Sequence, residues 1–394
     1  MNKESELAIK VKDLLTRGVD EVIDRETLEK KLLSGKKLRI KFGIDPTSPN
    51  IHLGRSIPLL KLRDFQDLGH QIVFIIGDST GIIGDTSDKD SERPMLTKGI
   101  VEKNLKNYKE QAGKIIDLSK AETHYNSEWL DKLNYGEIGR QAGVFSVNEF
   151  ISRENISKRL EAGKRVSLRE LLYPLMQGYD SVVVKSDVEI GGSDQRFNML
   201  AGRDMQREYG QEPQGVLTFP LIEGLDGRKM SSSWGNTGNL CDIPNDMFGK
   251  IMSLKDEYII KYFVQTTRVP METVNKYAEE LKSGTNPRDI KMKLAFEIVK
   301  FFHSEAEAEE AQTFWSNTFS KKELPTDIKT FTPTKYDLLS VIIEAGLVSS
   351  KSEAYRVFDQ NGVKVNGETV TDVKHVVKAG DIIQKGKMSF IKIA

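Results

Sequence analysis

The sequence predicts an α/β fold: a doubly wound domain with a parallel sheet, then an α-helical domain, then a small α+β domain. Three observations support this prediction. Strand and helix patterns alternate over residues 36–225, strand patterns fade over residues 243–325, and an Asn-Gly hairpin signal occurs within residues 335–394. A chain of 394 residues is also too long for one ordinary hydrophobic core, so several domains are expected.

The composition is that of a globular protein without a dominant charge. Its 58 basic and 58 acidic residues cancel, so a site for a polyanion has to be local. The single cysteine, Cys241, cannot form an intrachain disulfide, and no cluster of Cys and His has metal-ligand spacing. No segment has the apolar length needed to cross a bilayer. We therefore expect a cytoplasmic protein with no membrane partner and no tightly bound, protein-ligated metal.

The first elements expected are two helices within residues 1–35, packed on the domain that follows, because apolar residues recur there at helical spacing. Residues 38–44 alternate between apolar and charged or small side chains, as in a half-buried strand. A turn-rich break at residues 45–50 leads into a helix that ends near Gly69. The wholly apolar run at residues 72–76 suits a central parallel strand, which completes a strand–helix–strand unit.

The same alternation returns after residue 168. The pattern predicts a helix at residues 168–180, a strand at 181–185, a helix from about 191 to 209 and a strand at 216–222. Residues 36–225 are thus expected to form a Rossmann-like doubly wound domain. No Gly-x-Gly-x-x-Gly follows the first strand, which disfavours a dinucleotide cofactor such as NAD.

The remaining chain divides into a mobile Lys-Met-Ser-Ser-Ser loop and junction at residues 226–242, a helical domain at 243–325, a linker at 326–334 and a final domain at 335–394. Asn286, followed by proline, is typical of a helix start within the helical domain. The final domain is expected to hold short helices at residues 338–343 and 352–358 and a hairpin within 363–370. Its nine basic and seven acidic residues give a small positive charge, which is only weak support for nucleic-acid binding.

Two positions where helices follow strands suit a nucleotide. In an open α/β sheet, ligands bind beyond the carboxyl ends of the strands, where helix N-termini present backbone N–H groups. His52 can donate to phosphate oxygens there, and Gly54 removes a side chain that would bar close approach. After the later strand, Gly192 allows close approach and Asp194 can accept from ribose hydroxyls. Taken alone, His52 also fits an ordinary loop histidine and Gly54 a local accommodation, and the later pattern also fits a helix cap.

A polar stripe lies on the helix predicted at residues 168–180. Tyr173, Gln177 and Asp180 stand at i, i+4 and i+7, hence on one face. A hydroxyl, an amide and a carboxylate beside the neighbouring apolar residues suit a small amphoteric molecule with a hydroxyl and an ammonium group. The alternative is an amphipathic helix with its polar face in water.

Two polar loops offer cations to a polyphosphate. Residues 227–236 read Gly-Arg-Lys-Met-Ser-Ser-Ser-Trp-Gly-Asn, and the polar segment at residues 77–85 is followed by Lys89 and Arg93. Such cations neutralise charge that builds on a transferring phosphate group. The composition of the first loop also fits a flexible linker.

Together these motifs resemble a known family. His52-Leu-Gly-Arg55 is similar to the His-Ile-Gly-His signature of class I aminoacyl-tRNA synthetases, and Lys229-Met-Ser-Ser-Ser to their Lys-Met-Ser-Lys-Ser loop. Tyr173-x-x-x-Gln177-x-x-Asp180, followed by Gly-Gly-Ser-Asp-Gln, resembles the bacterial tyrosyl-tRNA synthetases in order and over nearly the whole chain. The resemblance implies an anticodon-binding role for the helical domain and a ribosomal-protein-type RNA-binding module at the C-terminus.

The resemblance also implies a two-step reaction and the residues that perform it. L-Tyrosine and ATP, the latter with Mg²⁺, would give tyrosyl-adenylate and pyrophosphate, and the tRNA specific for tyrosine would then take the tyrosyl group in a homodimeric enzyme. The implied catalytic residues are His52, Arg55, Lys89, Arg93 and Lys229. The implied ATP-binding residues are Asp45, His52, Gly54, Gly192, Asp194, Lys229, Met230, Ser231 and Ser232. The implied tyrosine-binding residues are Lys41, Asp85, Tyr173, Gln177, Asp180 and Gln195, with Asp180 on the phenol, Tyr173 facing the ammonium and Gln195 on the carboxylate.

The sequence departs from the family pattern at three positions. Arg55 replaces a second histidine, Ser232 replaces a second lysine, and Lys41 stands where many bacterial members have a tyrosine that contacts the phenol. Arg55 can still bind phosphate, and Arg228 is a candidate for the lost charge of the loop. Two alternatives stay open: a relative that has lost aminoacylation and only binds RNA, and the related tryptophan enzyme, against which the polar stripe argues.

Overall fold

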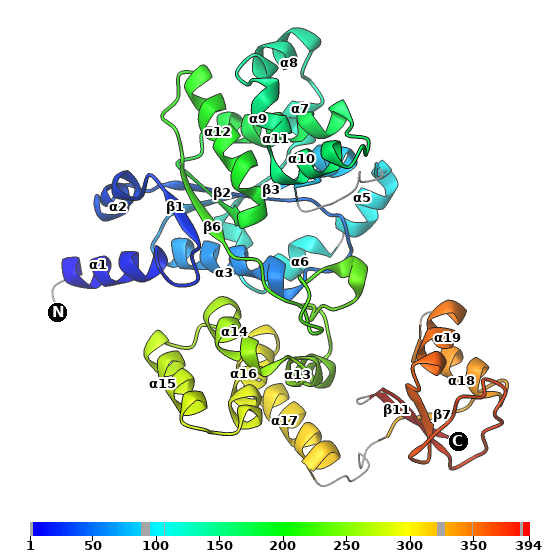
Figure 1. Cartoon of the computed structure of the whole chain (residues 1–394). Coiled ribbons are helices and arrows are strands. Elements are labelled where there is room, and N and C mark those ends of the chain that lie inside the picture. The colour runs from blue at the N-terminus through cyan, green and yellow to red at the C-terminus, as the bar shows by residue number, and fades with distance from the viewer. Residues whose placement is uncertain (1–2, 88–94, 106, 321–327, 349, 387–388) are drawn as a thin grey trace.

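A six-stranded sheet forms the centre of the first domain (Figure 1). The computed structural model describes residues 3–87, 95–105, 107–320, 328–348, 350–386 and 389–394. The strands are β1 (Glu21–Ile23), β2 (Arg39–Ile44), β3 (Gln71–Ile76), β4 (Glu122–Tyr125), β5 (Val188–Gly192) and β6 (Gly215–Phe219), in the order β1-β6-β5-β2-β3-β4. Strands β2 to β6 pair in parallel, and β1 pairs antiparallel with β6 at one edge. The predicted doubly wound α/β class is therefore confirmed.

Helices cover this sheet and connect its parallel strands. They are α1 (Lys3–Leu14), α2 (Arg25–Leu33), α3 (Leu53–Asp67), α4 (Asp78–Ile83), α5 (Lys98–Leu105), α6 (Tyr108–Gly113), α7 (Ser127–Leu130), α8 (Tyr135–Ala142), α9 (Val147–Ile151), α10 (Glu154–Glu161), α11 (Leu168–Val183) and α12 (Arg196–Glu208). The strand order reverses between β2 and β5, because the chain proceeds from β2 toward β4 on one side and from β5 toward β6 on the other. In such sheets ligands bind at this reversal.

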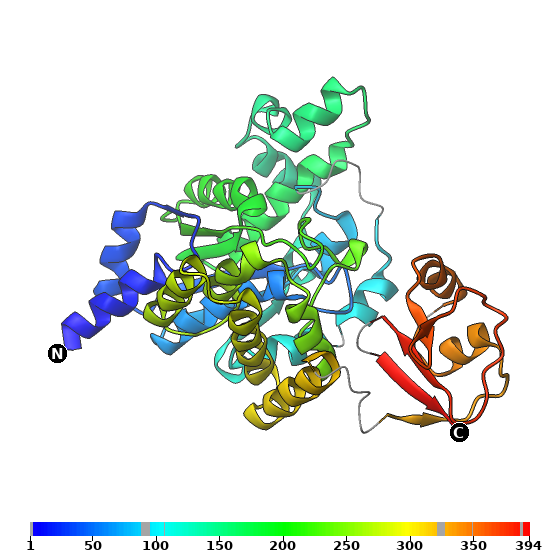
Figure 2. The same cartoon turned by 60° about the horizontal axis from the view of Figure 1, so that its bottom comes forward.

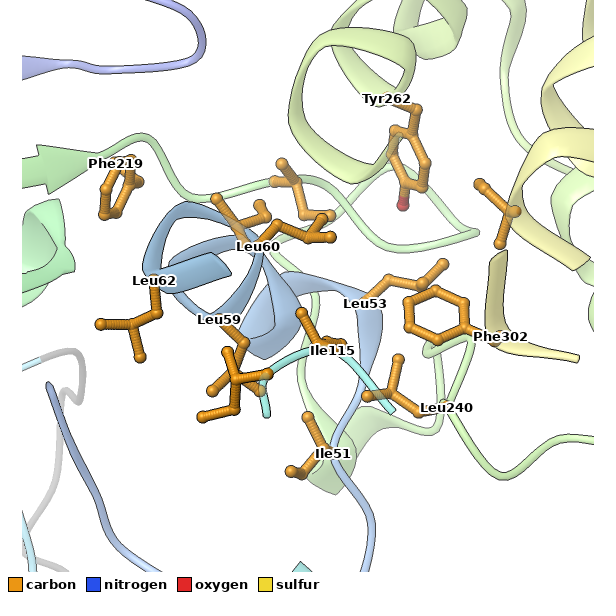
Figure 3. Packing of buried hydrophobic residues seen from close by; sticks show 14 of the residues in the cluster. Ile51, Leu53, Leu59, Leu60, Leu62, Ile115, Phe219, Leu240, Tyr262 and Phe302 are labelled. Atoms are coloured by element: carbon orange, nitrogen blue, oxygen red, sulfur yellow. The ribbon is translucent and has the colours of Figure 1, made fainter. Parts of the chain in front are cut away.

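A continuous hydrophobic cluster joins the sheet domain to the helical region that follows it. Figure 3 shows the cluster around α3, which contributes Leu53 and Leu59. Leu240, Tyr262 and Phe302, from the later part of the chain, belong to the same cluster. Because these side chains are buried together, the helical region packs directly on the domain that holds α3.

The helical region consists of α13 (Pro244–Met252), α14 (Ile259–Thr266), α15 (Met271–Lys282), α16 (Pro287–Phe302) and α17 (Glu305–Ser320). As predicted, Asn286 caps α16: its side chain accepts from the backbone N–H of Arg288. Among the helices of the described ranges, none has the combined length and apolarity of a transmembrane span.

The C-terminal domain has a sheet and a hydrophobic core of its own (Figure 2). Its elements are β7 (Thr330–Phe331), α18 (Leu338–Glu344), α19 (Lys351–Asp359), β8 (Val363–Val365), β9 (Glu368–Thr369), β10 (Ile382–Lys385) and β11 (Ser389–Ile393), with the strand order β7-β11-β10-β8-β9. The two predicted helices and the Asn-Gly hairpin are confirmed. Asn366 and Gly367 both have positive φ, as a two-residue turn between β8 and β9 requires.

The strand predicted at residues 181–185 is wrong, because α11 continues to Val183 and β5 starts only at Val188. Three consecutive valines favour a strand locally, but Val182 is buried in a cluster with Met205 of α12. Tertiary packing therefore overrides strand propensity here.

Other boundaries differ in smaller ways. The last strand of the sheet ends at Phe219 rather than residue 222, since Pro220 cannot donate to a ladder. The segment at residues 77–85, expected as a polar loop, contains α4. The short edge strands β1 and β4 were not predicted.

Candidate active site

A cavity of about 790 Å³ lies at the reversal of strand order. Its walls come from the segments that follow β2 and β5, the N-terminal end of α3, the inner face of α11 and the loop around residue 230. The predicted site residues that line it are Asp45, His52, Gly54, Arg55, Asp85, Tyr173, Gln177, Asp180, Gly192, Asp194, Gln195, Lys229, Met230, Ser231 and Ser232. Lys89 and Arg93 lie outside the described residues. A volume of this size is typical of a site for a small molecule or nucleotide.

His52 is the N-cap of α3, and its imidazole is neutral. The Nδ1 atom accepts a hydrogen bond from the backbone N–H of Arg55 at 3.3 Å, so the ring proton belongs on Nε2. Burial, and then the charges of Arg55 and Lys229, lower the pKa of His52 to about 3. The ring can therefore act at neutral pH as an Nε2–H donor at a helix N-terminus, where anions bind favourably.

Arg55 is fixed against the segment that follows β2. Its guanidinium donates to the hydroxyl of Thr47 at 2.7 Å and to that of Tyr108 at 2.8 Å. Ser232 of the serine loop lies against the same segment, with its Oγ 3.5 Å from the Oγ of Ser48. A permanent cation is therefore held at Thr47, next to the residue that Ser232 contacts.

Arg228 points to other partners. Its guanidinium pairs with Asp226 at 2.6 Å and lies 4.9 Å from the ring centre of Trp234. Arg228 is exposed and does not belong to the cavity wall, so its placement does not support the expected compensation for Ser232.

The loop that contains Lys229 is anchored at that residue and at the two residues after it. Met230 is buried, and its sulfur accepts from the backbone N–H of Gly54 at 3.2 Å. Asn236 donates to the carbonyl of Lys229 at 3.1 Å and accepts from the backbone N–H of Ser231 at 2.9 Å. These bonds make the segment a shaped wall of the cavity rather than a slack linker.

Two carboxylates and a phenol line the middle of the cavity. Tyr173 donates its hydroxyl to Asp45 at 2.9 Å, and Thr80 donates to the other oxygen of Asp45 at 2.7 Å. Burial raises the pKa of Asp45 to about 6, although the hydrogen bonds from Thr80 and Tyr173 act to lower it. Gln195 donates to Asp85 at 2.6 Å. The carboxylates give this part of the cavity a negative potential that suits an ammonium group.

Asp180 is a buried carboxylate held by two donors. The indole N–H of Trp129 donates to one oxygen at 2.8 Å, and Asn126 donates to the other at 3.3 Å. Burial raises the pKa of Asp180 to about 7, while the charge of Lys41 and the two donors act in the opposite direction. Trp129 and Asn126 follow β4, a strand that sequence reasoning missed. Recognising β4 would have drawn attention to Asn126 at its carboxyl end.

Lys41 differs from its expected placement on the substrate. It points from β2 to the back of the cavity wall and is fully buried. Its ammonium donates to the carbonyl of Gln177 at 2.8 Å and to Ser181 Oγ at 2.7 Å, and it lies 3.0 Å from Glu189 Oε1. These three partners match the three donors of an ammonium group, so Lys41 supports the wall and leaves no donor for a substrate.

Comparisons with known proteins show which family this chain resembles. The family described as tRNA synthetases class I (W and Y) matches residues 33–320, and the S4 domain matches residues 338–383. A tyrosine–tRNA ligase of Thermotoga maritima is 45% identical over 386 residues, which cover 97% of this chain and 96% of the relative. That of Mannheimia succiniciproducens is 44% identical over 382 residues, covering 96% of this chain and 97% of the relative.

Solved structures share the fold. A C-terminally truncated mitochondrial tyrosyl-tRNA synthetase of Aspergillus nidulans superimposes with a TM-score of 0.66 at 21% identity, over 80% of this chain and 99% of that one. The Archaeoglobus fulgidus enzyme, complexed with L-tyrosine, gives 0.63 at 23% identity, over 78% of this chain and 99% of that one. With these likenesses and the curated relatives, the chain belongs to the tyrosine–tRNA ligases, a family of class I aminoacyl-tRNA synthetases, and carries an S4 domain.

Proposed function

We propose that this cavity joins L-tyrosine to ATP and then passes the tyrosyl group to the terminal ribose of the tRNA specific for tyrosine. The observation that carries the proposal is the polarity of the cavity. A buried carboxylate, Asp180, belongs to the wall formed by α11, whereas a neutral imidazole and two cations belong to the wall formed by α3 and the serine loop. The first wall suits a phenol and the second a polyphosphate.

Asp180 selects the amino acid by accepting the hydrogen bond of the phenol. Trp129 and Asn126 already hold the carboxylate, so it does not have to reorganise when tyrosine binds. Phenylalanine would bury the same carboxylate without supplying the hydrogen bond of the hydroxyl, so it would bind less favourably. Tyr173, Gln177 and Asp85 would surround the ammonium group, and Gln195 would hold the carboxylate of the substrate.

The first chemical step needs positioning and charge stabilisation, and no covalent enzyme intermediate. A carboxylate oxygen of tyrosine forms a bond to the α-phosphorus of ATP, and the bond from that phosphorus to the bridging oxygen of pyrophosphate breaks. His52 would donate from Nε2 to phosphate oxygens, while Lys229 and Arg55 would neutralise the charge that moves onto the leaving group. Gly54, Gly192 and Asp194 would hold the nucleoside part.

Mg²⁺ would enter with ATP and neutralise charge on its phosphates. Within the described ranges no three His, Cys, Asp or Glu side chains gather as a metal site, and the cavity carboxylates Asp45, Asp85 and Asp180 each accept from protein donors. This donor set suits an ion carried by the nucleotide better than one held by the protein.

A homodimer is the proposed assembly. Large apolar side chains on α8, α9 and the start of α11 are exposed, among them Tyr135 at 93%, Val147 at 68% and Leu168 at 81%. A symmetric contact between two chains would bury such a surface. Light scattering is expected to give twice the mass of one chain, and a fully active monomer would contradict the proposal.

Charging of tRNA tests the complete function. With ATP, L-tyrosine and total bacterial tRNA, the protein is expected to form aminoacyl-tRNA that carries tyrosine. Normal charging would exclude the alternative of an RNA-binding relative without activity. Binding of tRNA without charging would support that alternative and contradict the proposal.

A further inference from the structure

Lys41 and Glu189 form a buried pair beside the polar stripe. Glu189 belongs to the cavity lining, Lys41 does not, and the reaction as described gives the pair no role. Lys41 is 0% exposed and Glu189 is 1% exposed. Burying two charges costs free energy unless each is paired and fully hydrogen-bonded. Because the two charges are buried beside Gln177, we expect the pair to have a function in the site.

Four hydrogen-bond donors contact the carboxylate of Glu189. Its Oε1 accepts from Gln177 Nε2 at 2.9 Å and lies 3.0 Å from Lys41 Nζ. Its Oε2 accepts from Ser181 Oγ at 3.2 Å and from the side-chain amide of Gln214. Because an ionised carboxylate only accepts hydrogen bonds, the group that Gln177 presents to Glu189 has to be its NH₂.

This contact fixes which end of the Gln177 amide faces the substrate. With the NH₂ bound to Glu189, the carbonyl oxygen is the remaining polar atom of a side chain that lines the cavity. Lys41 holds the same residue a second time, by donating to its backbone carbonyl at 2.8 Å. Lys41 also pairs with Glu189, with its Nζ 3.0 Å from Oε1.

We propose that Lys41 and Glu189 are positioning residues that orient the Gln177 amide, so that its carbonyl oxygen accepts a hydrogen bond from the ammonium group of tyrosine. If the Gln177 amide were flipped, its NH₂ group would face the ammonium group of tyrosine. Both groups are hydrogen-bond donors, so they would repel each other. The inference rests on the proposed function, since it requires tyrosine in the cavity. It assigns the Lys41–Glu189 pair to recognition of the amino group and leaves the phenol to Asp180.

The variant Glu189→Asp tests the proposal. Aspartate keeps the negative charge, and the long side chain of Lys41 can follow it, but the carboxylate withdraws by one methylene from Gln177. We expect the KM for tyrosine in ATP–pyrophosphate exchange to rise about tenfold, in line with the loss of a charge-assisted hydrogen bond, with the KM for ATP unchanged. Binding of 3-(4-hydroxyphenyl)propionate, which is tyrosine without the amino group, should not change.

The control and a second variant separate positioning from packing. Thr218→Val alters a buried hydroxyl on β6 that has no hydrogen-bond partner within the described chain, and it should leave both constants unchanged. The neutral pair Lys41→Met with Glu189→Gln roughly keeps the volume but removes the three donors of Lys41, and it can face Gln177 with either end of an amide. This double variant should show the same selective loss if Glu189→Asp does not fold.

Two results would overturn the inference. One is an equal loss of affinity for tyrosine and for the analogue without the amino group, because that pattern shows a general structural role. The other is an unchanged KM for tyrosine in both variants. Absence of tyrosine-dependent exchange in the wild-type protein would instead contradict the proposed function itself, so the two failures are distinguishable.

Discussion

Burial and the neighbouring hydrogen-bond donors set the pKa and the orientation of single residues in the cavity. Asp180 is buried, and Trp129 and Asn126 each donate to one of its two carboxylate oxygens. His52 is kept neutral, and its Nδ1 contact leaves Nε2–H as the donor. Each of these properties can be tested by changing one side chain.

Replacing Asp180 by alanine should impair selection of tyrosine more than binding of ATP. The phenol would lose a charge-assisted hydrogen bond, so kcat/KM for tyrosine is expected to fall by about 10- to 100-fold. The KM for ATP should stay near its wild-type value, since the proposed phosphate contacts come from α3 and the serine loop. Unchanged discrimination against phenylalanine would contradict this role.

The activity should depend on the ionisation of Asp180. Burial raises its pKa to about 7, and the ionised form is the better acceptor for the phenol, so kcat/KM for tyrosine should fall as the pH drops below about 7. A titration of kcat/KM between pH 5.5 and 8.5 measures this step. The step near pH 7 should vanish in Asp180→Asn, and its persistence there would assign the titration to another group.

The secondary-structure elements show which features the sequence could predict. The central strands β2 and β3 were predicted because an alternating run and a wholly apolar run suit buried strands. The edge strands β1 and β4 have only three and four residues, too few to show a period. The omission of β4 hid Asn126 and Trp129, which follow it. Motif residues were brought together as predicted, but the partner of Lys41 is Glu189, distant in sequence, which no local pattern reveals.

The N-terminal end of α3 and the serine loop are both expected to supply positive charge to the phosphates of ATP. Arg55 and Ser232 contact adjacent residues, Thr47 and Ser48, so a lysine introduced at position 232 would lie near the Arg55 guanidinium. We expect Arg55→Gln to lower the rate of adenylate formation by at least about tenfold in the native background. The loss should be smaller in a Ser232→Lys background, where the loop supplies a second cation.

A double-mutant cycle on presteady-state adenylate formation measures this coupling. Arg228→Gln is the matched control, because Arg228 is paired with Asp226 outside the cavity wall. Additive effects of Arg55→Gln and Ser232→Lys would show that the two positions act independently, contrary to the expectation.

At the scale of the whole molecule, the catalytic cavity and the S4 domain belong to parts of the chain that are packed separately. The sheet domain and the helical region share one hydrophobic cluster, whereas the C-terminal S4 domain has a core of its own. A protein that ends at residue 320 should therefore fold and keep tyrosine-dependent pyrophosphate exchange. Its charging of tRNA should fall strongly, and equal charging by the full and truncated chains would contradict an RNA-binding role for the S4 domain.

The measurement that tests the central claim most directly is ATP–pyrophosphate exchange with each of the twenty amino acids. Labelled pyrophosphate enters ATP only if the enzyme forms and reverses an aminoacyl-adenylate, so the assay reports the first step without tRNA. We predict exchange with L-tyrosine, far weaker exchange with phenylalanine, and none with tryptophan. No exchange with tyrosine, or a preference for tryptophan, would contradict the account.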